Sequence, residues 1–231
     1  MRKAVIIAIV GLMVMGGLVL PLADSFSGIT ARADRTRAVQ STFEYEWYKL
    51  YGGSGLESGH NVLRADDGSI YVLGTQTNLQ MSNLDLMLLK YDSGGDLLWV
   101  KTWDSGEGKN DFGMGLVMDS VGYLYVVGFK NSTTTSADSD SFLQKYDSNG
   151  NLLWTAYWGG AGMDFGMDLR LDSQGYIFIT GYTSSYGSGG KDVFLLKYAT
   201  NGTLLWQEYW GDADDQVGIG LAIDGSDNIY I

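Results

Sequence analysis

Four acidic residues stand at similar places along the chain, each just before a stretch that begins with a recurring glycine. They are Glu57, Asp111, Asp164 and Asp215. Carboxylates that converge on one point can hold Ca²⁺ through oxygen ligands, so these four are candidate ligand-binding residues. The simpler interpretation is that each accepts backbone hydrogen bonds within its own loop, and no loop matches the Asp-x-Asn-x-Asp-Gly calcium pattern with its distal glutamate. Calcium is therefore a secondary expectation, and no other cofactor is predicted.

Two further side chains stand apart from any repeated pattern. Tyr186 lies among serines and glycines, a composition that predicts a flexible, tyrosine-bearing loop suited to adaptable binding. His60 is the only histidine, so neither a histidine-paired nucleophile nor a multi-histidine metal site can be built without other partners. The sequence therefore yields no catalytic residue and no defined metal site.

Aspartates, lysines and tryptophans recur together at intervals of roughly 50 residues, which indicates internal repetition. The tryptophans are Trp47, Trp99, Trp154 and Trp206; the aspartates are Asp85, Asp140 and Asp192; the lysines, each five residues after an aspartate, are Lys90, Lys145 and Lys197. The tryptophans could stack on sugars or on a quinone cofactor, but an active site is needed only once, whereas these residues recur. We therefore assign the tryptophans to packing and the charged residues to contacts between strands or between repeats.

Each repeat contains four stretches with the character of short strands, which we letter A to D. Strand A begins at a glycine, and strand B is rich in β-branched and aromatic residues. Strand C carries apolar side chains on both alternating faces, which predicts a sheet covered on both sides. Strand D holds two tryptophans four residues apart, which therefore share a face. The B strands cover 70–74, 124–128 and 177–181, the C strands 85–91, 140–146 and 192–198, and the D strands 97–103, 152–158 and 204–210.

The connections between these strands are of two kinds. The A–B and C–D connections are tight turns that contain Asp or Asn followed by Gly, as at 119–122 and 147–150. The B–C and D–A connections are longer and differ in sequence. Since consecutive strands run antiparallel, the tight turns are expected at one end of each sheet and the variable loops at the other.

Four-stranded antiparallel sheets that repeat in this way describe an all-β fold, a β-propeller, better than a sandwich or a helical solenoid. The glycine of strand A favours an innermost position, where neighbouring blades crowd around the axis. The tryptophan-rich strand D is expected to be outermost.

The residues also resemble a known family. The pattern Asp-x-Phe-Gly-x-x-Leu-x-x-Asp-Ser-x-Gly-Tyr-Ile-Tyr-Val-x-Gly, followed by Asp-x-Phe-Leu-x-Lys-Tyr-Asp-x-x-Gly-x-Leu-Leu-Trp, is similar to SBBP-type, or seven-bladed, β-propeller repeats. The resemblance covers 43–231, and the first copy departs from it at Ala65 and at Ser58-Gly59. It implies an exported propeller, commonly without an assigned activity, and it carries over no catalytic residue.

The repeats predict an incomplete ring of about three and a half blades. The expected blades are 59–103, 112–158, 165–210 and a partial blade at 217–231, with 43–51 as a lone strand of the kind that closes a propeller ring. We expect the chain to be a fragment of a longer protein; the alternatives are a four-bladed ring that lacks one C strand, or a ring assembled from several chains. The polar residues 26–42 are predicted to be a linker.

The N-terminal residues 1–25 are predicted to form a hydrophobic helix, either a signal peptide or an uncleaved membrane anchor. Arg2 and Lys3 precede an apolar run over 4–22, which suits both interpretations. Either way, the rest of the chain is expected to be exported, as a secreted protein or on the extracellular face of the membrane.

These features favour a non-catalytic binding or scaffold module that presents its B–C and D–A loops to a protein or a cell-surface glycan. The 15 basic and 27 acidic residues give a net charge of −12, which disfavours nucleic acid, and contact with a membrane is expected only through the N-terminal segment. The alternative is a secreted enzyme, either a glycan hydrolase or lyase or a quinone-dependent dehydrogenase, whose site lies in a further C-terminal part.

Overall fold

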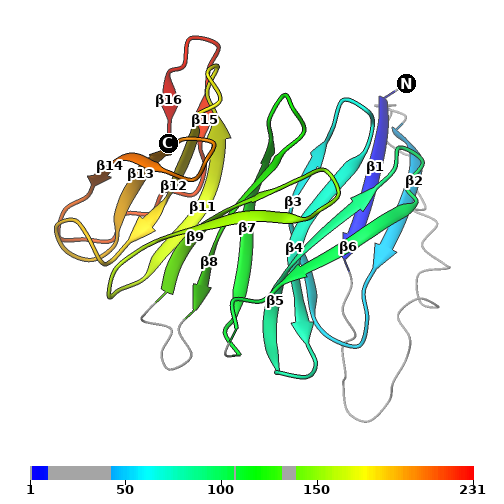
Figure 1. The fold of residues 1–231 in the computed structure, drawn as a ribbon, viewed down its shortest axis with the longest axis horizontal. Helices are drawn as coiled ribbons and strands as arrows, with labels where there is room; N and C mark the ends of the chain where they lie inside the picture. Colours follow the sequence, from blue (N-terminus) through cyan, green and yellow to red (C-terminus); the bar gives the residue numbers. More distant parts are fainter. Residues whose placement is uncertain (1, 10–42, 107, 132–138) are drawn as a thin grey trace, which may run out of the picture. The chain divides into compact units, whose positions relative to one another are not determined.

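A computed structural model describes residues 2–9, 43–106, 108–131 and 139–231 (Figure 1). The chain divides into two compact units, 1–58 and 59–231, which are described separately. The described residues form β-strands, turns and loops and contain no helix, as the repeat pattern predicts for an all-β protein. Within these residues, therefore, no helix is long and apolar enough to cross a membrane.

The first unit contains a pair of parallel strands, β1 (Arg2–Ile9) and β2 (Phe43–Tyr51). The sequence predicted a hydrophobic helix at the N-terminus, but its described part, Arg2–Ile9, is a strand. Val5, Ile6, Ile7 and Ile9 are β-branched, and such residues lose less side-chain freedom in a strand than in a helix. The rest of the predicted signal or anchor, and the predicted linker, lie outside the described residues. Trp47 is in β2.

The second unit is built from three four-stranded antiparallel sheets, in each of which the strands follow one another in chain order (Figure 1). The first sheet contains β3 (Glu57–Arg64), β4 (Ile70–Asn78), β5 (Asn83–Tyr91) and β6 (Leu97–Trp103). The second contains β7 (Asp111–Met118), β8 (Leu124–Asn131), β9 (Ser139–Tyr146) and β10 (Leu152–Trp158). The third contains β11 (Asp164–Leu171), β12 (Ile177–Thr183), β13 (Asp192–Tyr198) and β14 (Leu204–Trp210). The short strands β15 (Ala222–Ile223) and β16 (Ile229–Tyr230) pair with each other.

The middle strands of the sheets are buried on both faces, as the apolar alternation predicted. In β8, Leu124, Tyr125, Val126 and Val127 are all fully buried, although neighbouring side chains point to opposite faces. Leu124 and Val126 join an apolar cluster with β4 and β5 of the first sheet, whereas Tyr125 and Val127 join one with β12 and β13 of the third. Burying one such aliphatic side chain is worth about 1.5–3 kcal/mol, so the second sheet is held by both of its neighbours.

Glycine in the A strands allows one sheet to approach the next closely. A Cβ atom on Gly113 of β7 would lie 2.6 Å from Cδ1 of Leu73 in β4. A Cβ atom on Gly166 of β11 would lie 2.5 Å from Cγ2 of Val127 in β8. The recurring glycines are therefore explained by crowding between an A strand and the B strand of the preceding sheet.

The paired tryptophans of the D strands have different surroundings. Trp103 lies 4.9 Å, between ring centroids, from Phe142 of the second sheet, and Trp158 lies 4.5 Å from Phe194 of the third. The first tryptophan of each pair instead stands over an aromatic residue of its own sheet: Trp99 over Tyr71, Trp154 over Tyr125, and Trp206 over Phe178. The D-strand tryptophans of the first two sheets therefore fill space within and between sheets.

The recurring lysines lie over aromatic rings rather than beside the aspartates five residues earlier. The Nζ atom of Lys145 is 4.0 Å from the ring centroid of Tyr123 and donates to the carbonyl oxygen of Thr200 in the next sheet at 3.5 Å. Lys90 is placed in the same way over Tyr71. Lys197 lies over Tyr176 and pairs with Asp172 at 3.5 Å.

Most of the tight turns are held by an aspartate that accepts hydrogen bonds from two later backbone amides. In the turn after β9, Oδ1 of Asp147 accepts from the amides of Asn149 and Asn151 at 2.9 and 2.8 Å. The same arrangement occurs at Asp92, Asp119, Asp172 and Asp224. The hydrogen bonds from Asn151 lower the pKa of Asp147 below its ordinary value.

Asp147→Ala is expected to lower the free energy of unfolding by about 1 kcal/mol at pH 7, because two backbone amides lose their acceptor. Since the folded-state pKa is depressed, this contribution is complete above the ordinary aspartate pKa of about 4 and is lost as the pH falls below it. Urea unfolding of wild type and variant at pH 7 and pH 3 measures the difference. Ser148→Ala, at an exposed neighbour, should change little at either pH. An equal loss for Asp147→Ala at both pH values would contradict this account.

Candidate functional site

The variable loops of the second unit come together at one end of the sheets. We call this region the loop face; its described residues are 79–82, 104–106, 108–110, 159–163, 184–191 and 211–217. Each D–A loop bonds to a neighbouring strand end: the amide of Ser184 donates to the carbonyl oxygen of Met163 at 2.8 Å, and that of Gln216 to Lys191 at 2.6 Å. Backbone hydrogen bonds therefore connect neighbouring loops of this face.

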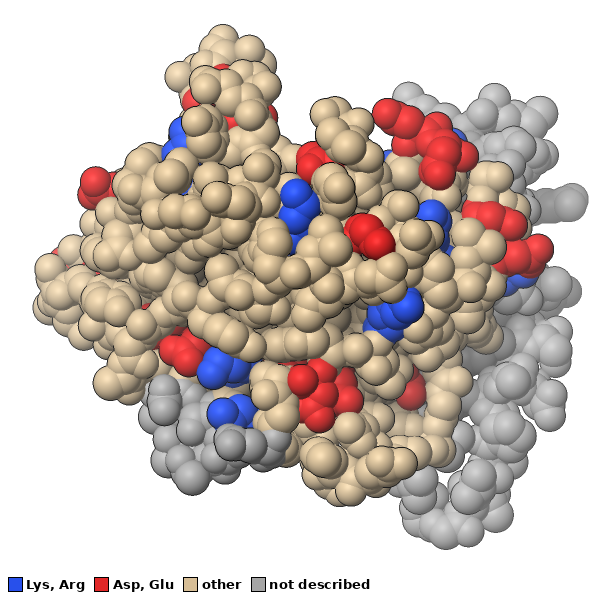
Figure 2. All heavy atoms as spheres, in the orientation of Figure 1, with Lys and Arg blue, Asp and Glu red and all other residues tan. Residues whose placement is uncertain are grey.

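The charges on the side of the molecule shown in Figure 2 are mixed. Acidic and basic side chains are scattered among uncharged ones, and the basic ones do not gather into a patch (Figure 2). Such a surface lacks the contiguous positive charge that binds a phosphate backbone.

Three of the four carboxylates proposed as ligands accept a hydrogen bond from their own loop. Glu57, which begins β3 just before the boundary between the two units, accepts from the amide of Gly53 at 3.1 Å. Asp111 accepts from the amide of Ser105 at 2.7 Å, and Asp164 from that of Gly160 at 2.8 Å. Among the described residues, the carboxylates close enough to share a metal ion with Asp111 include neither Asp164 nor Asp215.

Asp215 is not the residue that matches the other three in register. Counting back from the glycine of strand A, the matching residue is Gln216, whose Oε1 accepts from the amide of Asp212 at 3.0 Å. Asp215 instead accepts from the amide of Lys191 at 3.0 Å and pairs with its Nζ at 3.5 Å. The two-residue spacing between Gln216 and Gly218 is the feature of the sequence that identifies the matching position.

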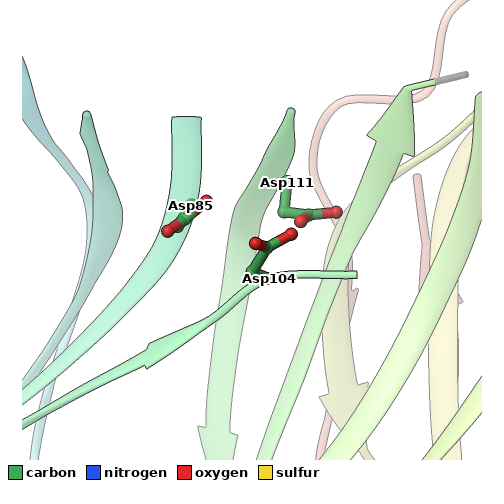
Figure 3. A group of neighbouring side chains, drawn as sticks. All are labelled: Asp85, Asp104 and Asp111. Atoms are coloured by element: carbon green, nitrogen blue, oxygen red, sulfur yellow. The ribbon is translucent and has the colours of Figure 1, made fainter. Parts of the chain in front are cut away.

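Three aspartates at or beside the loop face approach one another closely: Asp85 near the start of β5, Asp104 after β6, and Asp111 at the start of β7 (Figure 3). One carboxylate oxygen from each lies within 4.8 Å of the others. Asp111 is fully buried and Asp85 nearly so. Asp85 accepts from the side-chain amides of Asn78 and Asn83 at 3.0 and 3.1 Å.

The electrostatics of this group favour protonation or a bound cation. Burial, helped by the nearby charges of Asp104 and Asp85, raises the pKa of Asp111 to about 6 despite the hydrogen bond from the Ser105 amide. Burial also raises the pKa of Asp85. Sequence reasoning missed Asp104, because the matching positions of the other repeats are Gly159 and Gly211; that difference was the available signal.

The other two recurring aspartates of strand C have different partners. Asp140 pairs with Lys130 on the adjacent strand β8 at 3.1 Å. Asp192 is buried and accepts from the amide of Ser188 at 3.1 Å.

Tyr186 belongs to an aromatic group on the loop face. Its ring stacks on Tyr209 with centroids 5.5 Å apart and lies 5.4 Å from Trp158. Its hydroxyl donates to the carbonyl oxygen of Gly159 at 2.9 Å, and its amide donates to Oγ1 of Thr183 at 3.2 Å. The sequence predicted a flexible loop, whereas these contacts hold Tyr186 in place with 38% of its surface exposed.

His60 joins the first two sheets. Its Nδ1 atom lies 2.7 Å from the carbonyl oxygen of Gly113, to which it donates when it carries the proton. The contact is a link between sheets.

The chain is similar to two known repeat or regulatory proteins. It is 29% identical over 206 residues to the regulatory protein FlaEY of Caulobacter vibrioides, covering 74% of this chain and 21% of that protein. It is 25% identical over 178 residues to an uncharacterized WD repeat-containing protein of Acanthamoeba polyphaga mimivirus, covering 61% of this chain and 13% of that protein. The chain thus spans about a fifth or less of the length of these relatives.

No protein-family model matches the chain, so the SBBP type remains a prediction. WD repeats form four-stranded propeller blades, and the four-stranded antiparallel sheets found here fit the same architecture. The similarity to a regulatory protein and to a WD-repeat protein is consistent with a non-catalytic repeat module. The chain is therefore best described as similar to β-propeller repeat proteins.

Proposed function

We propose that this protein is an exported, non-catalytic binding module that presents the loop face to a protein partner. The observation that carries the proposal is the contrast between the two ends of the sheets. At one end the same aspartate turn recurs from sheet to sheet. At the other end each loop has its own residues and contacts, and variable loops on a rigid scaffold are where binding functions concentrate.

The group formed by Trp158, Tyr186 and Tyr209 is the most suitable contact point. Tyrosine and tryptophan dominate the energetics of protein interfaces, because a rigid aromatic ring buries much surface at little entropic cost. Here Trp158 is buried, and Tyr186 is both exposed and fixed by its hydrogen bond to Gly159. The ring is thus preorganised, which reduces the cost of ordering it on binding.

Export is part of the same proposal. Its support is the sequence of 1–25, where Arg2 and Lys3 precede an apolar run. Treating intact producing cells with a protease tests it: degradation of the repeat region without lysis is expected, and complete protection would contradict export.

Tyr186→Ser is expected to weaken partner binding by about 10-fold or more, because the exposed ring at the centre of the contact is removed. A photo-crosslinking residue at position 186 would first identify the partner on intact cells, and biolayer interferometry would then give the dissociation constants. The matched control is Val121→Ser, which alters a 78% exposed side chain in a turn at the opposite end.

The outcomes separate the alternatives. Unchanged binding by Tyr186→Ser, or equal weakening by Val121→Ser, would contradict the loop face as the contact surface. Binding that survives proteolysis of the partner but is abolished by glycosidases would replace the protein partner with a cell-surface glycan.

A further inference from the structure

Buried oxygen atoms without hydrogen-bond partners gather beside the three aspartates of the first two sheets. They are Oδ1 of Asp111, Oδ1 of Asn83 and Oγ of Ser105. Asp111 has no exposed surface and Asn83 has 3%. Ser105 donates its amide to Asp111, and Asn83 donates its side-chain amide to Asp85, so both belong to the same region. A buried polar atom that lacks a protein partner is costly, and an ordered water or a bound ion can satisfy it.

The carboxylates are arranged to receive that ion. Figure 3 shows Asp104 and Asp111 beside each other, with Asp85 on the neighbouring strand. Asp85 lies in the first sheet, Asp104 in the loop that follows it, and Asp111 in the second sheet, so the group spans the junction between two sheets. A cation among them would offset the repulsion between three negative charges in a partly buried place.

The junction between the second and third sheets provides an internal comparison. There Asp164 matches Asp111, Asp140 matches Asp85, and Gly159 stands in place of Asp104. Both oxygens of Asp164 have partners: Oδ1 accepts from the Thr183 hydroxyl, and Oδ2 accepts from the Gly160 amide and, at 2.6 Å, from the Ser185 hydroxyl. Asp140 is paired with Lys130.

That second junction also has no room for a third carboxylate. A Cβ atom on Gly159 would lie 2.8 Å from Oδ2 of Asp164 and would overlap Oδ1 of Asp140. Hydrogen bonds from the surrounding loops therefore satisfy both carboxylate oxygens of Asp164, whereas they satisfy only one carboxylate oxygen of Asp111. The extra carboxylate of Asp104 and the unpartnered Oδ1 of Asp111 occur at the same junction.

The donor atoms select the type of cation. Ca²⁺ accepts several carboxylate and side-chain amide oxygens in irregular arrangements, whereas Mg²⁺ gives up its water reluctantly and is seldom enclosed by protein ligands alone. The buried oxygens of Asp111 and Asn83 therefore favour calcium. We propose that Asp85, Asp104 and Asp111 bind one Ca²⁺ ion and thereby link the first and second sheets.

Calcium titration of the full chain tests the site. Isothermal titration calorimetry should show one site with a dissociation constant of about 10⁻⁴–10⁻³ M, the range of extracellular calcium modules. At 2 mM CaCl₂ the Tm should rise by about 2–4 °C over EDTA. MgCl₂ at the same concentration should give a smaller rise. The absence of a calcium-dependent signal at 5 mM would overturn the proposal, and an equal response to Mg²⁺ would overturn the assignment to calcium.

Two variants separate a built site from a diffuse acidic surface. Asp104→Asn should weaken calcium binding at least 10-fold and abolish the Tm shift, while Asp214→Asn, in the exposed acidic loop 212–215, should leave both unchanged. Equal losses in the two variants would overturn the site. The third measurement does not depend on how the variants fold: Tb³⁺ bound to the wild type should luminesce on tryptophan excitation, because Trp103 precedes Asp104, and CaCl₂ should quench it by displacement. Luminescence that calcium does not displace would contradict the site.

Discussion

Gly181→Ala is expected to lower the free energy of unfolding by about 3 kcal/mol or more, the largest loss we expect from adding a single carbon atom. A Cβ atom at this position would overlap the carbonyl oxygen of Phe165 and lie 2.8 Å from Cζ of Phe194. The first contact is with the backbone of the paired strand β11, which cannot rotate away as a side chain can. Relief therefore requires the two strands to separate, which would weaken their hydrogen bonds.

Urea unfolding followed by tryptophan fluorescence measures this loss. Gly220→Ala is the matched control, because a Cβ atom there would meet no atom within 4 Å. The control should be as stable as the wild type or slightly more stable, since alanine restricts the unfolded chain. If Gly181→Ala unfolded at the wild-type urea concentration, the described contact between β11 and β12 would be wrong.

Phe142→Ala is expected to cost about 3–5 kcal/mol. The ring is 1% exposed and fills the space opposite Gly128, where an added Cβ atom would lie 2.7 Å from Cζ of Phe142. It also contacts Trp103 of the first sheet, so its removal leaves a cavity between two sheets that neither backbone can easily close.

The repeats supply the control for this second variant. The matching pair in the first sheet is Gly74 opposite Met87, which shows that methionine fits in front of a strand-B glycine. Phe142→Met should therefore cost less than about 1.5 kcal/mol in the same urea experiment. A cost for Phe142→Met as large as that for Phe142→Ala would show that aromatic contact with Trp103, and not filled volume, is what matters.

The strands and turns could be predicted because repetition averages out local ambiguity. A glycine, an apolar alternation and an aspartate turn at matching places in successive copies identify one strand each, and the D strands have the predicted boundaries. The B strands begin where predicted but extend further, to Asn78, Asn131 and Thr183. The same reasoning overlooks a residue that occurs in only one of the repeats. Asp104 went unnoticed because its counterparts are glycines, and it is the residue that completes the acidic group.

Other differences arise from interactions that a single sequence does not reveal. Arg2–Ile9 is a strand although its apolar character suits a helix, because pairing with β2 satisfies its backbone and β-branched residues accept that geometry. Tyr186 looked mobile from its serine and glycine neighbours, yet Gly159, Trp158 and Tyr209 fix it from distant parts of the chain. Asp215 was aligned with the other acidic residues because of its charge, although Gln216 has the matching spacing to the glycine of strand A.

The division of β8 between two apolar clusters makes the second sheet a coupling element. The first and third sheets each contact the side chains of this one strand from opposite faces, so a disturbance at one junction reaches the other through a shared backbone. In a linear array governed by nearest neighbours, a middle member carries two interface terms. The second sheet therefore couples the unfolding of the first sheet to that of the third.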